Sequence, residues 1–374
     1  MTKPKHIVID ARIRRSTTGR YADRLVEHLQ KIDTFHQYTI LVQPDDPWKM
    51  TGKNFRTVPC PYPQFSVNPL KELGFARQLY SLKPDLVHFT MTQQPLFYFG
   101  NIVCTSHDTT MYNFVRRGSM PLPLYKMKMA LYTFLVWWSH RKSKHVIVPT
   151  QTVLDEFAER QPWVKKKLVV TYEASEPAMA IHSEKPSDVD GDFLLYVGTA
   201  FPHKNVRMLI EMMNVLIKKY PKLKLVITGK REEKHMVEIL EWAKTQPSYN
   251  NLVLPGFVSD AELKWLYENC KVYVFASLSE GFGLPPLEAM AHGAPVASSD
   301  ASVMPEVYGD AAHYFNARNA KDMATKTEEV MTNKKLRDSL IKKGHEQLKK
   351  YSWRKMAEET LVVYKEDLGE TIDA

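Results

Sequence analysis

Short apolar runs alternate with segments of helical periodicity along the whole chain. In the first half, these runs predict strands at 6–10, 38–42, 86–89, 102–105, 145–148 and 168–170. In the second half, similar runs predict strands at 193–198, 223–229, 251–256, 272–276 and 294–299. Several runs are apolar at every position, which is typical of strands covered on both faces of a parallel sheet.

Helical spacing of apolar residues separates the strands of the second half. It predicts helices at 208–217, 236–242, 261–267 and 284–291. Strand–helix alternation of this kind predicts an α/β fold, here two facing Rossmann-like domains with parallel sheets.

A polar run without periodicity, 182–192, interrupts the alternation. We therefore expect an N-terminal domain over 1–182, a second domain over 192–350, and a separate C-terminal segment over 351–374. Within that last segment, Ser352 is a plausible cap for a helix that continues to residue 368.

Length and composition agree with this organisation. The chain has 374 residues, of which 44% are hydrophobic and 25% charged, so disordered and collagen-like classes are excluded. Its 3 cysteines are far apart, which argues against a disulfide framework or a cysteine zinc site. Only the apolar run 7–9 precedes Asp10, whereas a signal peptide needs roughly 7–15 apolar residues, so we expect a cytoplasmic protein.

The net charge of +9 is distributed unevenly. Residues 1–187 hold 26 Lys and Arg against 15 Asp and Glu, which gives +11. The remaining residues hold 25 against 27, which gives −2. A one-sided positive charge favours a polyanionic partner: nucleic acid, an anionic membrane or a phosphorylated substrate.

The segment 116–144 concentrates this charge. Basic residues that include Arg116 and Arg117 bracket residues 129–140, which contain no charged residue but several aromatic ones. A helix that crosses a bilayer needs about 20 consecutive, mainly apolar residues, and the uncharged stretch of this segment is shorter than that. It predicts either a helix lying on an anionic membrane surface or a core helix whose ends are basic.

Candidate chemistry lies where strands end. In open parallel sheets, ligands bind outside the carboxyl ends of the strands. In the first half, Gly19 stands at the start of a predicted helix. The absence of a side chain there either allows backbone amides to approach a bound anion or is needed only for the conformation of the turn. His107 and Asp108 follow the strand at 102–105 and could bond a sugar hydroxyl or simply hold the structure.

Two loops of the second half carry the stronger signals. After Gly198, His203 and Lys204 precede a predicted helix, an arrangement that suits a diphosphate, and Lys230 follows the next strand. After the strand at 272–276, Glu280 precedes a glycine-containing turn and a helix that carries Glu288. The turn itself consists of Gly281, Phe282, Gly283 and Leu284. Carboxylates that accept from hydroxyls, beside amides that donate to phosphate, suit a phosphorylated sugar.

The region 279–296 resembles the E-x7-E region of retaining GT-B glycosyltransferases of family 4, and the resemblance covers nearly the whole chain. Residues 197–205 resemble the phosphate-binding loop of that family, 107–114 its His-Asp loop, and 352–364 its closing helix. The resemblance implies that this last helix packs back on the first domain.

The same resemblance implies roles for individual residues. Glu280 would contact the donor sugar, Glu288 the ribose and Lys204 the diphosphate, while His107 would bond the sugar near its 6-hydroxyl. Two departures from the family pattern weaken the expected grip on phosphate. Thr17 stands where a glycine is common, and His203 stands where an arginine is usual.

The implied reaction is the retaining transfer of a hexose from a nucleoside-diphosphate sugar, without a metal or other cofactor. The loop at 197–205 favours a bacterial mannosyltransferase and GDP-mannose, with UDP-hexoses as the alternative donors. The charge of the first half favours a glycan or polyprenyl-diphosphate-linked acceptor on the inner face of a membrane, with Asp108, Arg116 and Arg117 on the acceptor side. On this interpretation, replacing Glu280 or Lys204 with alanine abolishes transfer and leaves thermal stability nearly unchanged.

Three other functions were weighed. The run 188–192 contains D-x-D matches of the kind that bind metal in GT-A enzymes, but it lies in the predicted linker. A basic nucleic-acid-binding protein leaves the loop around Glu280 and Glu288 unexplained. A sugar-nucleotide-binding protein without turnover would show the same loops, and release of free nucleoside diphosphate separates it from an enzyme.

Overall fold

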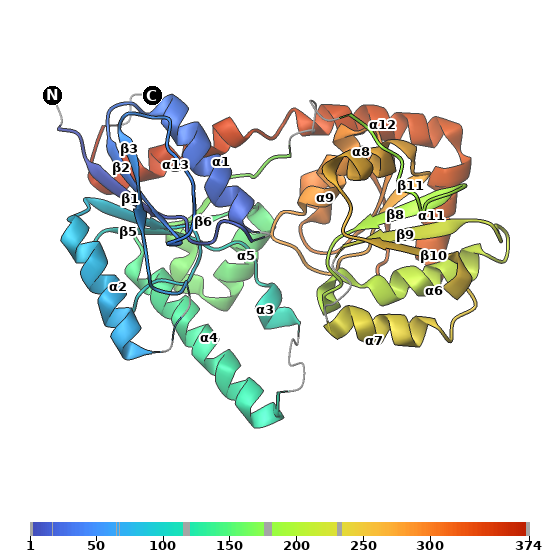
Figure 1. The fold of residues 1–374 in the computed structure, drawn as a ribbon, viewed down its shortest axis with the longest axis horizontal. Helices are drawn as coiled ribbons and strands as arrows, with labels where there is room; N and C mark the ends of the chain where they lie inside the picture. Colours follow the sequence, from blue (N-terminus) through green and yellow to red (C-terminus); the bar gives the residue numbers. More distant parts are fainter. Residues whose placement is uncertain are drawn as a thin grey trace. The chain divides into compact units, whose positions relative to one another are not determined.

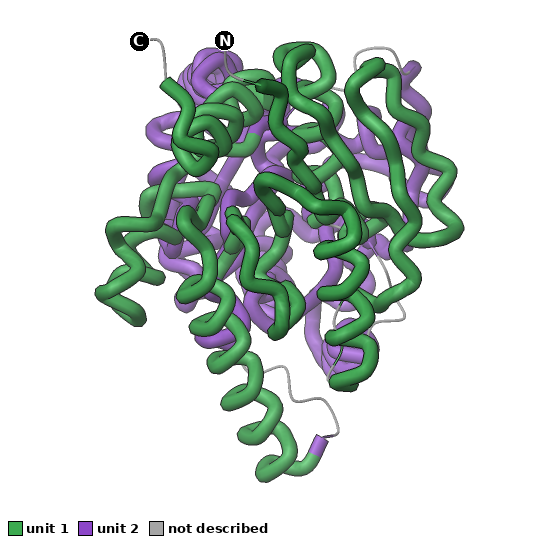
Figure 2. Tube along the Cα trace, turned by 90° about the vertical axis from the view of Figure 1, so that its left-hand side faces the viewer, with its two compact units in different colours: residues 1–108, 121–173, 352–374 green, residues 109–120, 174–351 purple. Residues whose placement is uncertain are grey.

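The computed structural model describes residues 3–16, 18–64, 66, 68–114, 120–175, 182–229 and 234–371. Its contacts divide the chain into two compact units, coloured green and purple in Figure 2. Unit 1 contains 1–108, 121–173 and 352–374, and unit 2 contains 109–120 and 174–351. The division therefore falls at Glu173, earlier than the polar run at 182–192, and the segment 109–120 belongs with the second unit.

Unit 1 is built on a parallel sheet with the strand order β3-β2-β1-β4-β5-β6-β7. Its strands are β1 (His6–Asp10), β2 (Gln37–Val42), β3 (Phe55–Pro59), β4 (Leu86–Phe89), β5 (Ile102–Thr105), β6 (His145–Val148) and β7 (Leu168–Val170). The strand β3 was not predicted, because it is an edge strand whose sequence, Phe-Arg-Thr-Val-Pro, has neither a continuous apolar run nor a regular alternation, and it is only partly buried.

Helices cover both faces of this sheet (Figure 1). They are α1 (Gly19–Ile32), α2 (Pro69–Leu82), α4 (Leu122–Lys142), α5 (Gln151–Arg160), the 3-10 helix η1 (Pro162–Lys167) and α13 (Trp353–Leu368). The last of these, α13, lies beside α1 and also contacts β4 and β6. The prediction that the C-terminal helix packs back on the N-terminal unit is therefore confirmed.

Unit 2 is built on a second parallel sheet, with the order β10-β9-β8-β11-β12-β13. Its strands are β8 (Phe193–Val197), β9 (Lys224–Thr228), β10 (Leu252–Gly256), β11 (Val272–Phe275), β12 (Val296–Ser299) and β13 (Ala312–Phe315). The edge strand β13 was not predicted, because its sequence Ala-His-Tyr-Phe lacks a continuous apolar run. Two parallel sheets confirm the predicted Rossmann-like architecture.

The helices of unit 2 are α3 (Thr110–Asn113), α6 (Val206–Leu216), α7 (Lys234–Ala243), α8 (Asp260–Asn269), α9 (Leu284–Ala291), α10 (Met304–Tyr308), α11 (Ala320–Thr332) and α12 (Lys334–Leu348), with 3-10 turns η2 (Pro202–Lys204), η3 (Tyr249–Asn251) and η4 (Gly309–Ala311). The core of this unit joins apolar side chains of α6 and α11 to the strands beneath them, as with Leu209, Met213 and Met323. All three side chains are fully buried. Because these helices pack on the strands, the core also determines where the loops at the strand ends lie.

Candidate functional site

The order of the second sheet determines where its candidate residues meet. From β8 the chain adds β9 and β10 on one side of the sheet, and it then adds β11, β12 and β13 on the other side. The strand order therefore reverses between β8 and β11, while all strands stay parallel. In doubly wound sheets, ligands bind in the crevice at this switch point. The loop after β8 contains Gly198 to Asn205, and the loop after β11 contains Ala276 to Gly283. The two strongest sequence signals thus lie on the two sides of this switch point, which we call the crevice of unit 2.

Hydrogen bonds tie these two loops together. The Leu278 amide donates to the His203 carbonyl at 2.7 Å. The Asn205 side chain donates to the carbonyl oxygens of Ala276, at 3.2 Å, and Ala317, at 2.8 Å. Asn205 has φ +59°, a conformation that asparagine tolerates better than most residues. Its amide therefore fixes the start of α6 against the end of β11.

Lys204 and Glu280 form the centre of this crevice. The Lys204 ammonium donates to both carboxylate oxygens of Glu280, at 2.6 and 2.8 Å. Their side chains are 19% and 12% exposed, so the ion pair is largely removed from water. The resemblance had implied separate contacts for these residues with diphosphate and sugar. The structure instead places their charged groups against each other.

Two glycines of the crevice are required by close contacts. Gly283 has φ +84°, and a Cβ there would lie 2.2 Å from the Tyr308 hydroxyl, which donates to the Gly283 carbonyl at 2.8 Å. Gly229 has φ +146°, and a Cβ there would lie 2.4 Å from the Gly198 carbonyl oxygen. The loop after β9 therefore packs directly on the loop after β8.

The remaining predicted residues of unit 2 lie around this centre. Glu288 is partly buried on α9 and accepts a hydrogen bond from the Tyr267 hydroxyl at 3.3 Å. His203 is only 4% exposed, and its ring stacks on Phe201 with 5.9 Å between centroids. The His203 side chain is therefore largely removed from solvent. Gly281 and Leu284 are partly buried, and Phe282 is buried. Lys230 lies outside the described residues.

Buried hydroxyls without partners lie beneath the same crevice. Among the residues that the structure describes, Tyr196, Tyr273 and Ser277 have side-chain oxygens that are buried and accept or donate no hydrogen bond. All three stand on β8 or β11 or directly after β11. Burial raises the pKa of both tyrosines, so these groups stay neutral. Unpaired buried polar atoms are uncommon in folded proteins; these three stand on or next to the strands of the switch point, and others are found elsewhere in the described residues.

In unit 1, His107 follows β5 at the carboxyl edge of the sheet. Its Nε2 lies 2.9 Å from the Thr90 carbonyl oxygen, and its Nδ1 lies 3.4 Å from the Glu173 carboxylate. Burial lowers the pKa of His107, but the bond and charge of Glu173 raise it more, so its pKa lies above the ordinary value. Glu173 was not predicted as a site residue. It stands just after β7, so the strand-end rule used elsewhere could have found it.

The other N-terminal candidates divide into described and undescribed residues. Gly19 is buried as the first residue of α1, and a Cβ there would lie 2.7 Å from the Ile13 carbonyl oxygen. This close packing accounts for the glycine without a bound anion. Asp108 directly follows His107 and is partly buried. Arg116 and Arg117 lie outside the described residues.

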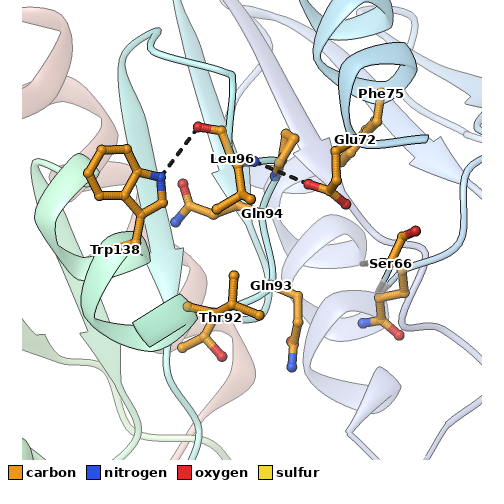
Figure 3. Close-up of a pocket in the computed structure, with 11 residues that line it drawn as sticks. Ser66, Glu72, Phe75, Thr92, Gln93, Gln94, Leu96 and Trp138 are labelled. Atoms are coloured by element: carbon orange, nitrogen blue, oxygen red, sulfur yellow. Dashed lines mark hydrogen bonds between the residues drawn. The ribbon is translucent and has the colours of Figure 1, made fainter. Parts of the chain in front are cut away.

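Unit 1 also has an open pocket at the carboxyl edge of β4 (Figure 3). Its volume is about 400 Å³, open solvent included. Figure 3 shows Trp138 on one side and Glu72 and Ser66 on the other, with Gln94 between them. Trp138 donates to the Leu96 carbonyl at 3.3 Å, and the Leu96 amide donates to Glu72 at 3.2 Å. The walls therefore combine an aromatic ring with neutral amides, hydroxyls and a carboxylate.

The acidic run 188–192 lies on the surface. Asp190 is paired with Lys185 and Asp192 with Lys271, at 2.5 and 3.0 Å. Within the described ranges, no group of three or more His, Cys, Asp and Glu side chains is arranged to hold a metal ion. Nor does any helix in those ranges combine the length and apolar character needed to span a membrane.

Comparison with known proteins connects these features to a family. The family model "Glycosyltransferase Family 4" matches residues 18–174, and the model "Glycosyl transferases group 1" matches residues 179–347. The serotype-specific mannosyltransferase WbdA of Escherichia coli is 34% identical over 171 residues, which cover 44% of this chain and 21% of WbdA. The O-antigen chain mannosyltransferase RfbU of Salmonella typhimurium is 29% identical over 236 residues, which cover 60% of this chain and 64% of RfbU.

The chain thus spans about a fifth of WbdA and less than two thirds of RfbU. Among solved structures, sucrose-phosphate synthase from Thermosynechococcus elongatus superposes with a TM-score of 0.74 at 16% identity, covering 97% of this chain and 98% of that one. This likeness concerns the fold, which is GT-B. Both halves of the chain match models of one class of enzyme, and the protein belongs to glycosyltransferase family 4, the glycosyl transferases of group 1.

Proposed function

We propose that this protein transfers a hexose from a nucleoside-diphosphate sugar to a glycan acceptor, with retention at the anomeric carbon and without a metal ion. The observation that carries the proposal is the pairing of Lys204 with Glu280 at the switch point of the second sheet. A cation and a carboxylate there suit the diphosphate and the sugar of a nucleoside-diphosphate sugar. Lys204 takes the diphosphate, and Glu280 accepts hydrogen bonds from the sugar hydroxyls.

The chemistry follows from the charge of the leaving group. As the bond to the anomeric carbon breaks, negative charge grows on the diphosphate, and Lys204 and the N-termini of α6 and α9 stabilise it. The Lys204 ammonium then exchanges its bond with Glu280 for bonds to phosphate oxygens. We favour attack of the acceptor hydroxyl on the face that the diphosphate leaves, with the hydroxyl proton passing to the departing diphosphate; this attack retains the anomeric configuration.

For the donor, we propose GDP-mannose first and UDP-hexoses as the alternative. Support comes from the mannosyltransferases WbdA and RfbU, whose matched regions are 34% and 29% identical to this chain. The loop from Gly198 to Asn205 also has the form expected of mannosyltransferases. A non-catalytic protein would bind the same nucleotides, so binding and turnover need separate measurements.

For the acceptor, we propose a glycan carried on a lipid diphosphate at an anionic membrane surface. Large apolar side chains are exposed along one face of α4, at i, i+3 and i+4 spacing. They are Leu124, Met127, Leu131, Phe134 and Trp137, which are 45%, 63%, 39%, 48% and 38% exposed. A core helix would bury this face, so the interpretation of α4 as a surface helix is favoured over the core-helix interpretation.

Basic residues accompany this apolar face. Lys126, Lys128 and Arg141 of α4 are exposed, and α4 contains no acidic residue. Trp163 of η1 lies beside Trp137, with 6.4 Å between ring centroids, and the exposed Lys165 and Lys166 follow it. Apolar and aromatic groups flanked by lysines are the arrangement that binds an anionic lipid interface. This surface would hold the enzyme where lipid-linked acceptors are found.

A panel of nucleotides tests the donor proposal. Thermal unfolding is measured with GDP, UDP and ADP, with their sugars, and without nucleotide, all in excess EDTA. A ligand that binds the folded state raises the melting temperature, by an amount that grows with the logarithm of one plus the ratio of its free concentration to Kd. We expect GDP and GDP-mannose to give the largest rise. A rise in melting temperature with UDP and its sugars alone would show that the donor is a UDP-hexose and not GDP-mannose. No rise with any nucleotide would contradict the proposed function.

A further inference from the structure

The contacts of His107 specify its protonation. Its Nε2 lies 2.9 Å from the Thr90 carbonyl oxygen, and its Nδ1 lies 3.4 Å from Glu173 Oε1. A carbonyl oxygen and an ionised carboxylate can only accept hydrogen bonds. A neutral imidazole has a single N–H and can serve only one of them, whereas the imidazolium serves both. The surroundings of His107 are therefore built for the cation.

The ring also has little freedom to turn away from these partners. The His107 side chain is 13% exposed and that of Glu173 is 10% exposed. The ring of Tyr21, on α1, stands edge-on to the imidazole at 5.0 Å between centroids and 81° between planes. Rotation of the imidazole would break both contacts at once, so the observed orientation is held from three sides.

We propose that Glu173 is a positioning residue that holds His107 as a fixed imidazolium at the carboxyl edge of the first sheet. This inference rests on the proposed glycosyl transfer and changes the role expected for His107 within it. With one N–H directed to Glu173 and the other to Thr90, His107 has no ring N–H left for a sugar hydroxyl. It acts through its positive charge and its shape, and Glu173 determines both.

The neighbouring charges support a cation at this position. Glu173 faces Nδ1, and Asp108 is the next residue along the chain; both favour the charged form. His88, on β4, also lies close enough to act on His107, but burial lowers the pKa of His88 to about 3, so His88 is neutral at physiological pH. Tyr21 stays un-ionised because burial raises its pKa. Among the described groups that face His107, none carries a positive charge that would disfavour the imidazolium.

The replacement Glu173→Gln tests the proposal, because glutamine keeps the shape of the side chain and removes its charge. If transfer needs the imidazolium, activity is full below the pKa of His107 and falls as the pH rises through it. Without Glu173 that pKa is lower, so the alkaline limb of kcat/KM moves to lower pH. We expect a shift of about one pH unit or more, with a matching shift of the His107 ring resonances in an NMR titration.

A matched control is Glu329→Gln on α11. Glu329 also pairs with a histidine, His313, at 2.6 Å, but His313 lies on the edge strand β13 of unit 2, whereas His107 and Glu173 belong to unit 1. We expect that variant to keep the wild-type pH profile. Glu173→Ala, which removes the partner altogether, should lower kcat by about tenfold or more with an unchanged melting profile for unit 2.

The outcomes separate this inference from the proposed function. An active wild-type enzyme whose alkaline limb and His107 titration are the same in Glu173→Gln would overturn the role of Glu173. If the NMR titration of His107 shifts but the pH–rate profile does not, then transfer does not need His107 in its charged form, and the proposed role of the imidazolium is contradicted. Nucleotide binding without any transfer by the wild-type protein would instead contradict the proposed function.

Discussion

At the scale of single residues, the ion pair of Lys204 and Glu280 has consequences for both stability and activity. From the sequence alone, each residue was expected to be dispensable for stability, as a solvated charge would be. The structure corrects that expectation, because the two side chains are only 19% and 12% exposed and bond each other. Removing one partner leaves the other as an uncompensated, partly buried charge.

We therefore predict that Lys204→Ala and Glu280→Ala each lower the free energy of unfolding by about 1–3 kcal/mol. The double variant should lose less than the sum of the two, since neither charge is then left alone. Chemical unfolding of the four proteins gives the coupling energy. The exposed pair Lys244 and Glu241 on unit 2, 53% and 65% exposed, is the control and should show almost no coupling. Strict additivity at Lys204 and Glu280 would contradict the pairing.

Some residues of the site could be predicted and others could not, for physical reasons. Glu280 and Gly283 were found because a loop after an apolar strand is recognisable in one sequence. The pairing of Lys204 with Glu280 was not, because these residues are 76 positions apart and meet only through the strand order. Glu173 was missed although its strand was predicted, because its partner His107 lies on a different strand of the same sheet.

At the scale of elements, α4 carries the proposed membrane surface. We predict that the protein floats with vesicles containing anionic phosphatidylglycerol and remains free with phosphatidylcholine alone. High salt should weaken the binding, because the lysines act through charge. The double replacement Leu131→Ser and Phe134→Ser removes apolar area from the exposed face of α4 and should abolish flotation.

The control for this experiment lies on another helix of the same unit. Leu70 and Leu73 of α2 are 78% and 49% exposed, so Leu70→Ser with Leu73→Ser removes comparable apolar surface elsewhere. This control variant should float as the wild type does. Equal loss in both double variants, or no flotation of the wild type at low salt, would contradict the assignment of α4.

The end of α13 is held by histidines, which predicts a pH dependence. His36 bonds Asp33 at 2.8 Å and Glu370, just beyond α13, at 3.1 Å. Burial lowers the pKa of His36, but the bonds to these two carboxylates raise it above its ordinary value. His145 bonds Asp367 at 2.9 Å, which raises its pKa as well. Both histidines therefore stabilise the docked helix in their charged form.

A raised pKa gives stability that is present in full below the ordinary histidine pKa of about 6.5 and is lost as the pH rises through the folded-state value. We predict that amide protons of α13 exchange faster at pH 8.5 than at pH 6, after correction for the intrinsic rate. In His36→Asn this difference should shrink. His182→Asn, at a histidine that is 80% exposed, should keep it. Equal corrected protection of α13 at both pH values would contradict this role.

Most strands were predicted, including the edge strands β7 and β10, but the sequence analysis proposed no helix at α2, α5, α11 or α12. The predicted helix 284–291 coincides with α9, because Gly283 and the prolines after it mark its start. The edge strands β3 and β13 were missed because neither has a continuous apolar run. The exposed face of α4 could not be read from periodicity, since apolar spacing alone does not distinguish a buried face from a surface that binds lipid.

At the scale of the whole molecule, the charge asymmetry acquires a structural setting. The excess of +11 over residues 1–187 falls mainly on unit 1, which contains α4 and the pocket beside Trp138. Over the bounds of the two units, unit 1 has a net charge of +7 and unit 2, which holds the crevice with Lys204 and Glu280, has +2, which sum to the +9 of the chain. This division fits a donor bound by a few placed groups and an acceptor attracted by a broad positive surface.

We propose that the crevice of unit 2 carries out retaining, metal-independent hexosyl transfer. The direct measurement is an assay with GDP-mannose and an undecaprenyl-diphosphate-linked glycan in excess EDTA, with the anomeric configuration of the product read by NMR. We predict an α-linked mannosyl product, the configuration of the donor, and its loss in Lys204→Ala with nucleotide binding weakened. A β-linked product, transfer that disappears with EDTA, or full activity of Lys204→Ala would contradict the account.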